Sequence, residues 1–148
     1  MSRSREQVIW DFVQEWLGKA EGDLRSAQHL LTLPQPDYFT AAFHAQQAAE
    51  KFLKAFLVRH QIPFPKSHDI QELLGLAGGV IAGLKAELAS AAMLTPFGVD
   101  FRYPGEQIAD LWTAREAVEE ARRVREVIQQ HLQSYLRQGR PENLGERR

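Results

Sequence analysis

The sequence contains no cysteine. A chain without thiols has no disulfide framework, no thiolate zinc site and no cysteine nucleophile. Long apolar runs are missing too: no stretch approaches the roughly 18 consecutive apolar residues of a membrane span. The opening stretch "MSRSREQVIW" lacks the apolar segment of a signal peptide. We therefore expect a cytoplasmic protein that does not enter a membrane.

Neither sign of charge is in excess. The 18 Lys and Arg residues are balanced by 19 Asp and Glu residues, for a formal net charge of -1 and a sequence pI near 6.5. Proteins that coat nucleic acid usually carry a basic excess, so the composition does not indicate one, although it leaves a local basic patch open. With 148 residues, 44% of them hydrophobic, the chain is long enough for one domain with a core.

Several motifs of metal and nucleotide sites are absent. There is no Glu-x-x-His of a di-iron bundle, no His-Glu-x-x-His of a zinc enzyme, and no Gly-rich phosphate loop. The glycines at 75, 78 and 79 are too sparse for such a loop and follow no strand. We therefore expect no metal and no cofactor.

Helical periodicity dominates what is present. In the first helix, apolar residues recur at spacings of three and four, which places them on one face. They are Trp10, Val13, Leu17, Ala20, Leu24, Ala27 and Leu31. The prolines of "LPQPD" (33–37) end this helix, and a second runs from Tyr38 to His60, before "IPFP".

Three further helices are predicted. Ser67 or Asp69 can cap a short third helix that ends at Gly78-Gly79. A fourth helix is marked by Val80, Leu84, Leu88, Ala91 and Leu94, and it ends at "TPFGVDFRYPG" (95–105). A long fifth helix is marked by Ala114, Val118, Ala121, Ile128, Leu132 and Tyr135.

No apolar alternation of strand length appears. The expected fold class is therefore all-α, an antiparallel up-and-down helical bundle of four long helices and one short helix. We expect the bundle domain to span residues 1–136. The polar stretch "RQGRPENLGERR" predicts a disordered tail over residues 137–148.

The second helix carries many polar groups for a core helix, in the stretch "FHAQQAAEKFLKAFLVRHQI" (43–62). A helical wheel places Glu50 and Lys54 opposite its broad apolar side. That second side is either solvated surface with an ordinary Glu50–Lys54 ion pair, a homodimer contact, or a groove that faces a ligand. In the fifth helix, Arg125 interrupts an apolar stripe and needs an acidic partner, for which Glu50 is the first candidate.

The sequence resembles the HEPN family, the "higher eukaryotes and prokaryotes nucleotide-binding" domain. Four landmarks of the family occur in order: "WLGKAEGDLRSAQHLL" (16–31), the Gln-Gln-x-x-Glu-Lys-x-x-Lys stretch from Gln46 to Lys54, Ser67-His68-Asp69, and Arg102-Tyr103-Pro104. The resemblance implies a helical bundle that commonly forms a homodimer. It also implies a prokaryotic setting, often beside a small nucleotidyltransferase partner in a toxin–antitoxin pair.

Ribonuclease members of that family are recognised by an arginine followed, after four to six residues, by a histidine. Arg102 has no histidine within that reach. Arg125 and His131 meet the spacing formally, but they lie about 120° apart around their helix. Two function classes stay open. One is an interaction and nucleotide-binding module without chemistry of its own. The alternative is a metal-independent endoribonuclease that cleaves RNA with Arg125 or Arg102 and a displaced histidine, for which His131 is the candidate.

Four residues are candidates for holding a nucleotide. Lys54, His68 and Arg102 supply cationic donors for a phosphate, and Tyr103 supplies a ring for stacking on a base. Structural roles are open for two of them as well. His68 can cap the third helix or hydrogen-bond across its loop, and Arg102 can anchor its loop to a carboxylate such as Glu50.

Overall fold

The computed structural model describes residues 2–98 and 109–144, and every regular element in these ranges is a helix. The three long helices are α1 (Arg5–Leu30), α2 (Tyr38–Arg59) and α5 (Leu111–Gln138). Three short elements lie between α2 and α5: α3 (Ile70–Gly78), α4 (Leu84–Glu87) and the 3₁₀ helix η1 (Ala89–Phe97). The predicted all-α class is confirmed.

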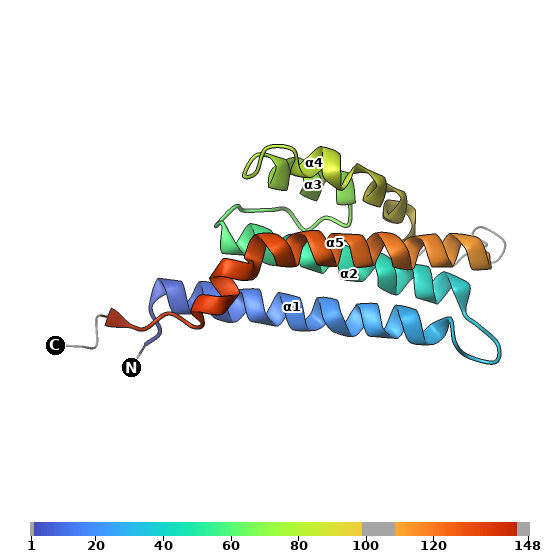
Figure 1. Cartoon of the computed structure of the whole chain (residues 1–148), viewed down its shortest axis with the longest axis horizontal. Coiled ribbons are helices and arrows are strands. Elements are labelled where there is room, and N and C mark those ends of the chain that lie inside the picture. Colours follow the sequence, from blue (N-terminus) through green and yellow to red (C-terminus); the bar gives the residue numbers. More distant parts are fainter. Residues whose placement is uncertain (1, 99–108, 145–148) are drawn as a thin grey trace.

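The long helices lie side by side, and the short elements cover one side of them (Figure 1). α1 runs antiparallel to α2 and α5, so that Trp10 near its start meets Tyr135 near the end of α5. α2 and α5 run in the same direction, because the chain passes back along the bundle through α3, α4 and η1 before α5 begins (Figure 1). The up-and-down alternation is therefore present, with its third pass made of short pieces.

Polar caps fix where the helices begin. Ser4 forms a capping box with Gln7 at the start of α1, and Asp37 accepts a hydrogen bond from the Thr40 N–H at the start of α2. Asp69 caps α3 as predicted, by accepting from the Gln71 N–H at 2.9 Å. Asp110 accepts from the Thr113 N–H at 2.8 Å, and this bond lowers the pKa of Asp110. Each cap satisfies an N–H group that has no partner within the helix.

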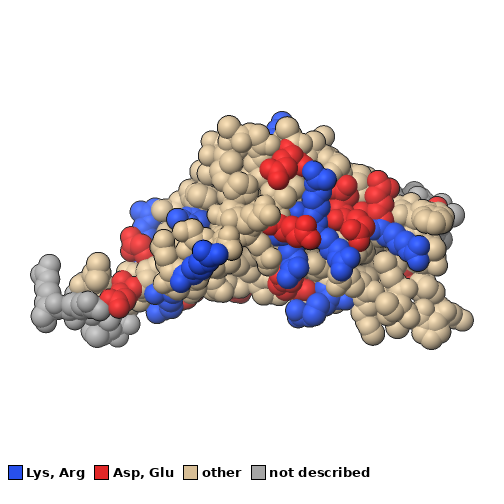
Figure 2. Space-filling model, in the orientation of Figure 1, with Lys and Arg blue, Asp and Glu red and all other residues tan. Residues whose placement is uncertain are grey.

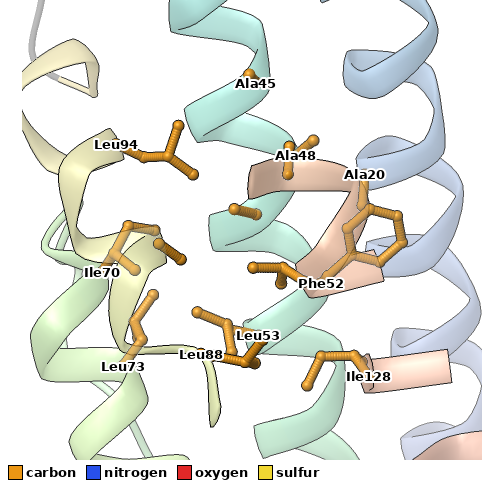
Figure 3. Packing of buried hydrophobic residues seen from close by; sticks show 14 of the residues in the cluster. Ala20, Ala45, Ala48, Phe52, Leu53, Ile70, Leu73, Leu88, Leu94 and Ile128 are labelled. Atoms are coloured by element: carbon orange, nitrogen blue, oxygen red, sulfur yellow. The ribbon is translucent and has the colours of Figure 1, made fainter. Parts of the chain in front are cut away.

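α2 is the central helix, in contact with α1, α3, η1 and α5. Its small side chains allow those neighbours to come close, and Ala45, Ala48 and Phe52 have no exposed surface. Figure 3 shows α2 between Ala20 of α1 and the side chains of Ile70 and Leu73. The apolar core of the bundle is therefore built around α2.

The predicted fourth long helix is wrong. Gly83 adopts a positive φ of 86°, which interrupts the chain before the four residues of α4, and the 3₁₀ helix η1 follows with Pro96 inside it. A 3₁₀ helix has three residues per turn, so residues spaced by three share a face. Buried residues follow this spacing at Leu88, Ala91, Leu94 and Phe97. The sequence pattern thus identified the buried residues but not the type of helix.

The predicted tail boundary at 137 also needs correction. Residues 137 and 138 belong to α5, and the chain beyond it packs against the start of α1. Arg140 forms an ion pair with Asp11 at 2.9 Å, and the Pro141 carbonyl accepts a hydrogen bond from Gln7 at 3.0 Å. Among the described residues, no helix is both long enough and apolar enough to cross a membrane.

Two glycines give a stability test of this backbone with opposite expected signs. A Cβ added at Gly83 or at Gly75 would meet no atom within 4 Å, so neither substitution changes stability through a packing contact. Gly83→Ala should destabilise the protein by about 1 kcal/mol or more, because an alanine is strained at positive φ. Gly75→Ala should stabilise it by about 0.5–1 kcal/mol, because alanine favours the helical state. Urea unfolding measures both, and a stabilised Gly83→Ala variant would contradict the break at this position.

Candidate functional site

A row of polar side chains lies buried along α2. Gln46, Glu50 and Lys54 are 0%, 2% and 7% exposed, and their spacing of four residues places them on one side of the helix. The linker between α2 and α3 covers this row: the His68 ring contacts Glu50, and Phe64 lies near Lys54. Of the three interpretations of this side of the helix, a solvated surface is wrong for Glu50 and Lys54, since the chain buries these residues itself.

Glu50 is the centre of the row. Its Oε1 lies 2.7 Å from Nδ1 of His68, and its Oε2 accepts a hydrogen bond from Nζ of Lys54 at 3.2 Å. A buried carboxylate costs several kcal/mol unless it is paired and hydrogen-bonded. Lys54 offsets that charge, and its ammonium also lies 5.4 Å from the centre of the Trp16 ring. The Glu50–Lys54 pair predicted from the sequence is present, but in the interior.

His68 is held at two points and is still open to solvent. Its backbone carbonyl accepts a hydrogen bond from Nε2 of Gln46 at 3.1 Å, and its ring contacts Glu50, yet its side chain is 55% exposed. With Nδ1–H donating to the carboxylate, the Nε2 atom is left for another partner. Of the two structural roles considered for His68, the cap of α3 is supplied by Asp69, and the His68 ring contacts Glu50 of α2 rather than its own loop.

A shallow groove of about 490 Å³ lies beside the His68 ring. It is lined by Pro65, Lys66, Ser67, His68, Asp69, Glu72 and Thr95. The Thr95 hydroxyl accepts a hydrogen bond from the Ile70 N–H at 3.2 Å, which ties η1 to the first turn of α3. The groove thus joins the linker, α3 and η1 in front of an exposed imidazole.

Gly98 connects this network to the segment that follows η1. A Cβ at Gly98 would lie 2.5 Å from Cδ of Gln46, so only glycine fits against this side chain. Arg102 and Tyr103, the remaining nucleotide-binding candidates, lie outside the described residues, as does any contact of Arg102 with Glu50. Gly98, the last described residue before them, lies against the buried row.

A second polar cluster joins α1 to α2 and was not anticipated from the sequence. Asp23 forms an ion pair with Lys51, and its Oδ1 lies 3.0 Å from Nδ1 of His44. Its carboxylate is 15% exposed. Asp23 is 21 residues from His44 and 28 residues from Lys51 in the sequence, so no local motif indicates this cluster. Only the helical periodicity of α1 and α2 could have suggested it.

The predicted pairing of Arg125 with Glu50 is wrong. Nε of Arg125 donates to Oε1 of Glu21 on α1 at 2.7 Å, and Gln129 donates to the same oxygen at 3.0 Å. The Arg125 side chain is 40% exposed, so this pair lies near the surface. The wheel located Arg125 beside the core correctly, but α1 rather than α2 supplies the carboxylate.

The formal Arg125 and His131 match does not form a joint site within one chain. Arg125 contacts α1 through Glu21, whereas the His131 ring lies 6.3 Å from the Phe56 ring of α2. The two side chains thus point to different neighbours. Across residues 2–98 and 109–144, no cluster of three or more His, Asp or Glu side chains is placed to hold a metal ion.

Replacing one partner of each ion pair separately, Glu50 in one and Arg125 in the other, tests which ion pair is buried. Glu50→Ala should destabilise the protein by roughly 3 kcal/mol or more, because Lys54 would be left as an uncompensated buried charge. Arg125→Ala should cost no more than about 1 kcal/mol, since its pair is partly exposed and Glu21 keeps its bond from Gln129. Urea unfolding compares them directly. A larger loss for Arg125→Ala would contradict this assignment.

The comparisons with known proteins agree with the geometry of the bundle. No curated protein and no solved structure matches the chain. The family model of the HEPN domain matches residues 13–132, which include α1 from its third turn, the buried row, His68 and most of α5. This family comprises modules of the nucleotide-binding and ribonuclease type. Because its model covers well over half of the chain, the protein belongs to the HEPN domain family.

Proposed function

We propose that this HEPN protein is an interaction and nucleotide-binding module that takes a nucleotide phosphate in the groove beside His68. The observation that carries the proposal is the contact between the buried Glu50 carboxylate and the exposed His68 imidazole. A carboxylate at Nδ1 orients the ring and leaves its Nε2 atom for a ligand. Lys66 adds a cationic side chain to the groove, which is suited to an anionic ligand.

Lys54 has a different role from the one first assigned to it. Its side chain is only 9% exposed and its ammonium is paired with Glu50, so it does not reach the groove as a free donor. Lys54 instead offsets the buried carboxylate that holds His68. The groove also contains two acidic residues, Asp69 and Glu72, which disfavour an anion. The Asp69 carboxylate, however, already accepts a hydrogen bond from the Gln71 N–H at the start of α3.

Arg102 and Tyr103 complete the proposed site. A guanidinium binds phosphate oxygens in pairs, and a tyrosine ring stacks on a base. Their segment follows Gly98, which lies against Gln46 of the same network. The combination supplies binding groups for a nucleotide. We assign no reaction to it, because Arg125 and His131, the pair on which the ribonuclease alternative rests, contact different helices.

We further propose that the protein forms a homodimer and associates with a small nucleotidyltransferase in a toxin–antitoxin-type pair. Trp112 at the start of α5 is 71% exposed, a large apolar surface for one chain to leave in water. Phe43 and Val58 of α2 are partly exposed as well. Leu57, the neighbour of Val58, is fully buried and takes no part.

Nucleotide binding is tested by calorimetric titration of ATP into the native protein and into single variants. His68→Ala and Arg102→Ala should each weaken binding by about tenfold or more, because each removes a charge-assisted bond to phosphate. His29→Ala is the matched control, since His29 is an exposed histidine on α1, outside the groove. Equal affinity in all four proteins would remove the proposed site. Cleavage of labelled RNA that is lost in His131→Ala would establish the ribonuclease alternative instead.

The dimer is tested by light scattering at micromolar concentration. The native protein should show twice the chain mass of 16.9 kDa. Trp112→Ser should shift it toward the monomer, because the substitution removes the largest exposed apolar side chain. Leu144→Ser is the control, since Leu144 is 70% exposed but lies in the tail. A native protein that scatters as a monomer would contradict the homodimer.

A further inference from the structure

A second group of basic side chains lies where α2 ends beside the last turns of α5. It consists of Arg59, His60 and His131, with Tyr135 next to them, and will be called the α2–α5 cluster. The start of α1 also reaches this end of the bundle, because Trp10 packs on Tyr135 with ring centres 5.1 Å apart. Figure 2 shows basic side chains at the end of the molecule where α5 ends and α1 begins, with acidic ones among them.

The end of α2 holds the first two members in place. The Gln61 N–H bonds to the Val58 carbonyl and the Ile62 N–H to the Leu57 carbonyl, which is the Schellman arrangement of a helix end. Gln61 takes the left-handed conformation this turn requires, with φ 56°, although glycine is the usual residue there. Its side chain accepts a hydrogen bond from Arg5 of α1 at 2.6 Å. The turn is therefore anchored on both sides.

Arg59 is oriented without an acidic partner. Its guanidinium lies 4.2 Å from the centre of the Tyr135 ring, and among the described residues no carboxylate pairs with it. Stacking of this kind fixes the plane of a guanidinium and leaves its N–H edge available. The nearest acidic residue that affects Tyr135 is Asp11. Arg140 and Arg3 already bind Asp11 and hold its pKa at about 2, so it does not neutralise Arg59.

The two histidines flank one aromatic ring. The His60 ring lies 4.6 Å and the His131 ring 6.3 Å from the centre of the Phe56 ring. Burial lowers the pKa of His60, and the neighbouring Arg59 and His131 lower it further. Arg59 is cationic, so the position favours a negative charge from outside the chain.

One more polar group lacks a partner here. The hydroxyl of Tyr135 is buried and makes no hydrogen bond in the described structure. A buried hydroxyl without a bond costs about 1–3 kcal/mol, and such groups in native proteins often mark the place of a water or an ion. An oriented guanidinium, two imidazoles and an unpaired hydroxyl thus meet at the same end of the bundle.

We propose that Arg59, His60 and His131 form an oxyanion site that binds a phosphate group, separate from the groove beside His68. The N–H edge of Arg59 suits two phosphate oxygens, and the imidazoles supply further donors. The site is distinct in position, because Arg59 lies nine residues after Glu50 and thus about 180° around α2 from it. The phosphate comes either from a free nucleotide or from the backbone of single-stranded RNA, and binding alone is assigned to it.

The site gives His131 an arginine neighbour that its sequence spacing does not reveal. Arg125 is six residues away on the same helix but is bound to Glu21. Arg59, on a different helix, stacks on Tyr135, which lies one turn after His131 on α5. The parallel packing of α2 and α5 therefore places this arginine and this histidine at the same end of the bundle.

Three probes test the site on the full chain: inorganic phosphate, ATP, and a fluorescent single-stranded RNA of random sequence. Calorimetry measures the first two and fluorescence anisotropy the third. Arg59→Met keeps an apolar stem on Tyr135 and should weaken binding of at least one probe by tenfold or more. His131→Gln, at an exposed position, is the second variant and should weaken the same probe. Arg123→Met and His29→Gln are the controls and should bind as the native protein does.

The pH dependence adds a readout that a structural role would not change. The groups that act on His60 are Arg59 on its own helix and His131 on α5. Beside them, Tyr135 of α5 contacts Arg59, and Arg5 of α1 bonds to the adjacent Gln61. Because a bound anion favours protonated imidazole, affinity should rise as the pH falls from 8 to 6. The rise should be smaller in His60→Gln.

The probes also separate this site from the groove. If only the RNA binds, and Arg59→Met weakens it, the phosphate comes from a nucleic acid; if phosphate and ATP bind as well, a free nucleotide suffices. Both results support the site. ATP binding that falls in His68→Ala, together with binding of all three probes that is unchanged in Arg59→Met and His131→Gln, would overturn the α2–α5 site and leave the proposed function intact. Binding of none of the three probes would overturn it as well.

Discussion

The buried carboxylate of Glu50 is the constraint on which the arrangement of this protein depends. A negative charge in the middle of the central helix is tolerated only where it is paired, and the chain meets this requirement with Lys54 from the same helix and His68 from the linker. Two consequences follow from one interaction. The linker is drawn across α2, which covers the polar row, and an imidazole is fixed at the surface with one nitrogen free.

The third pass of the bundle can cover the polar row of α2 and hold His68 at the surface because it is made of short elements. A continuous helix would present one regular face to α2, whereas the linker, α3 and η1 bring separate loops to the same place. Thr95 at the end of η1 and Asp69 at the start of α3 both line the groove beside His68. The long helices provide a rigid frame, and the broken pass carries the candidate site.

The sequence predicted much of this fold and only part of the site. Helical periodicity identified the three long helices, and Asp69 and Gly78-Gly79 marked the ends of α3, because these signals are local. The break at Gly83 was missed because spacings of three and four fit α-helix and 3₁₀ helix alike over one short segment. The partner of Arg125 was missed because a wheel shows which side of a helix a residue occupies, but not which neighbour covers that side. For the same reason, the wheel could not show that the linker buries Glu50.

The two proposed anion sites occupy opposite sides of α2 and differ in how their cationic groups are held. At the groove, a buried carboxylate orients His68. At the α2–α5 cluster, aromatic rings orient Arg59 and the histidines without a carboxylate. In both cases a group that would move freely in water is fixed before any ligand arrives, which reduces the entropy lost on binding. Membership of the HEPN family gives the general class of function, and these contacts supply specific residues for it.

The most direct test of the central claim is a double-mutant cycle between Glu50 and His68, read out as ATP affinity. The native protein, Glu50→Gln, His68→Ala and the double variant are titrated under one condition, after thermal melts show that each is folded. If Glu50 acts by holding His68, then Glu50→Gln should weaken ATP binding in the native background and have little further effect once His68 is alanine. Losses that simply add would contradict the account, because they would mean that Glu50 does not act on the ligand through His68.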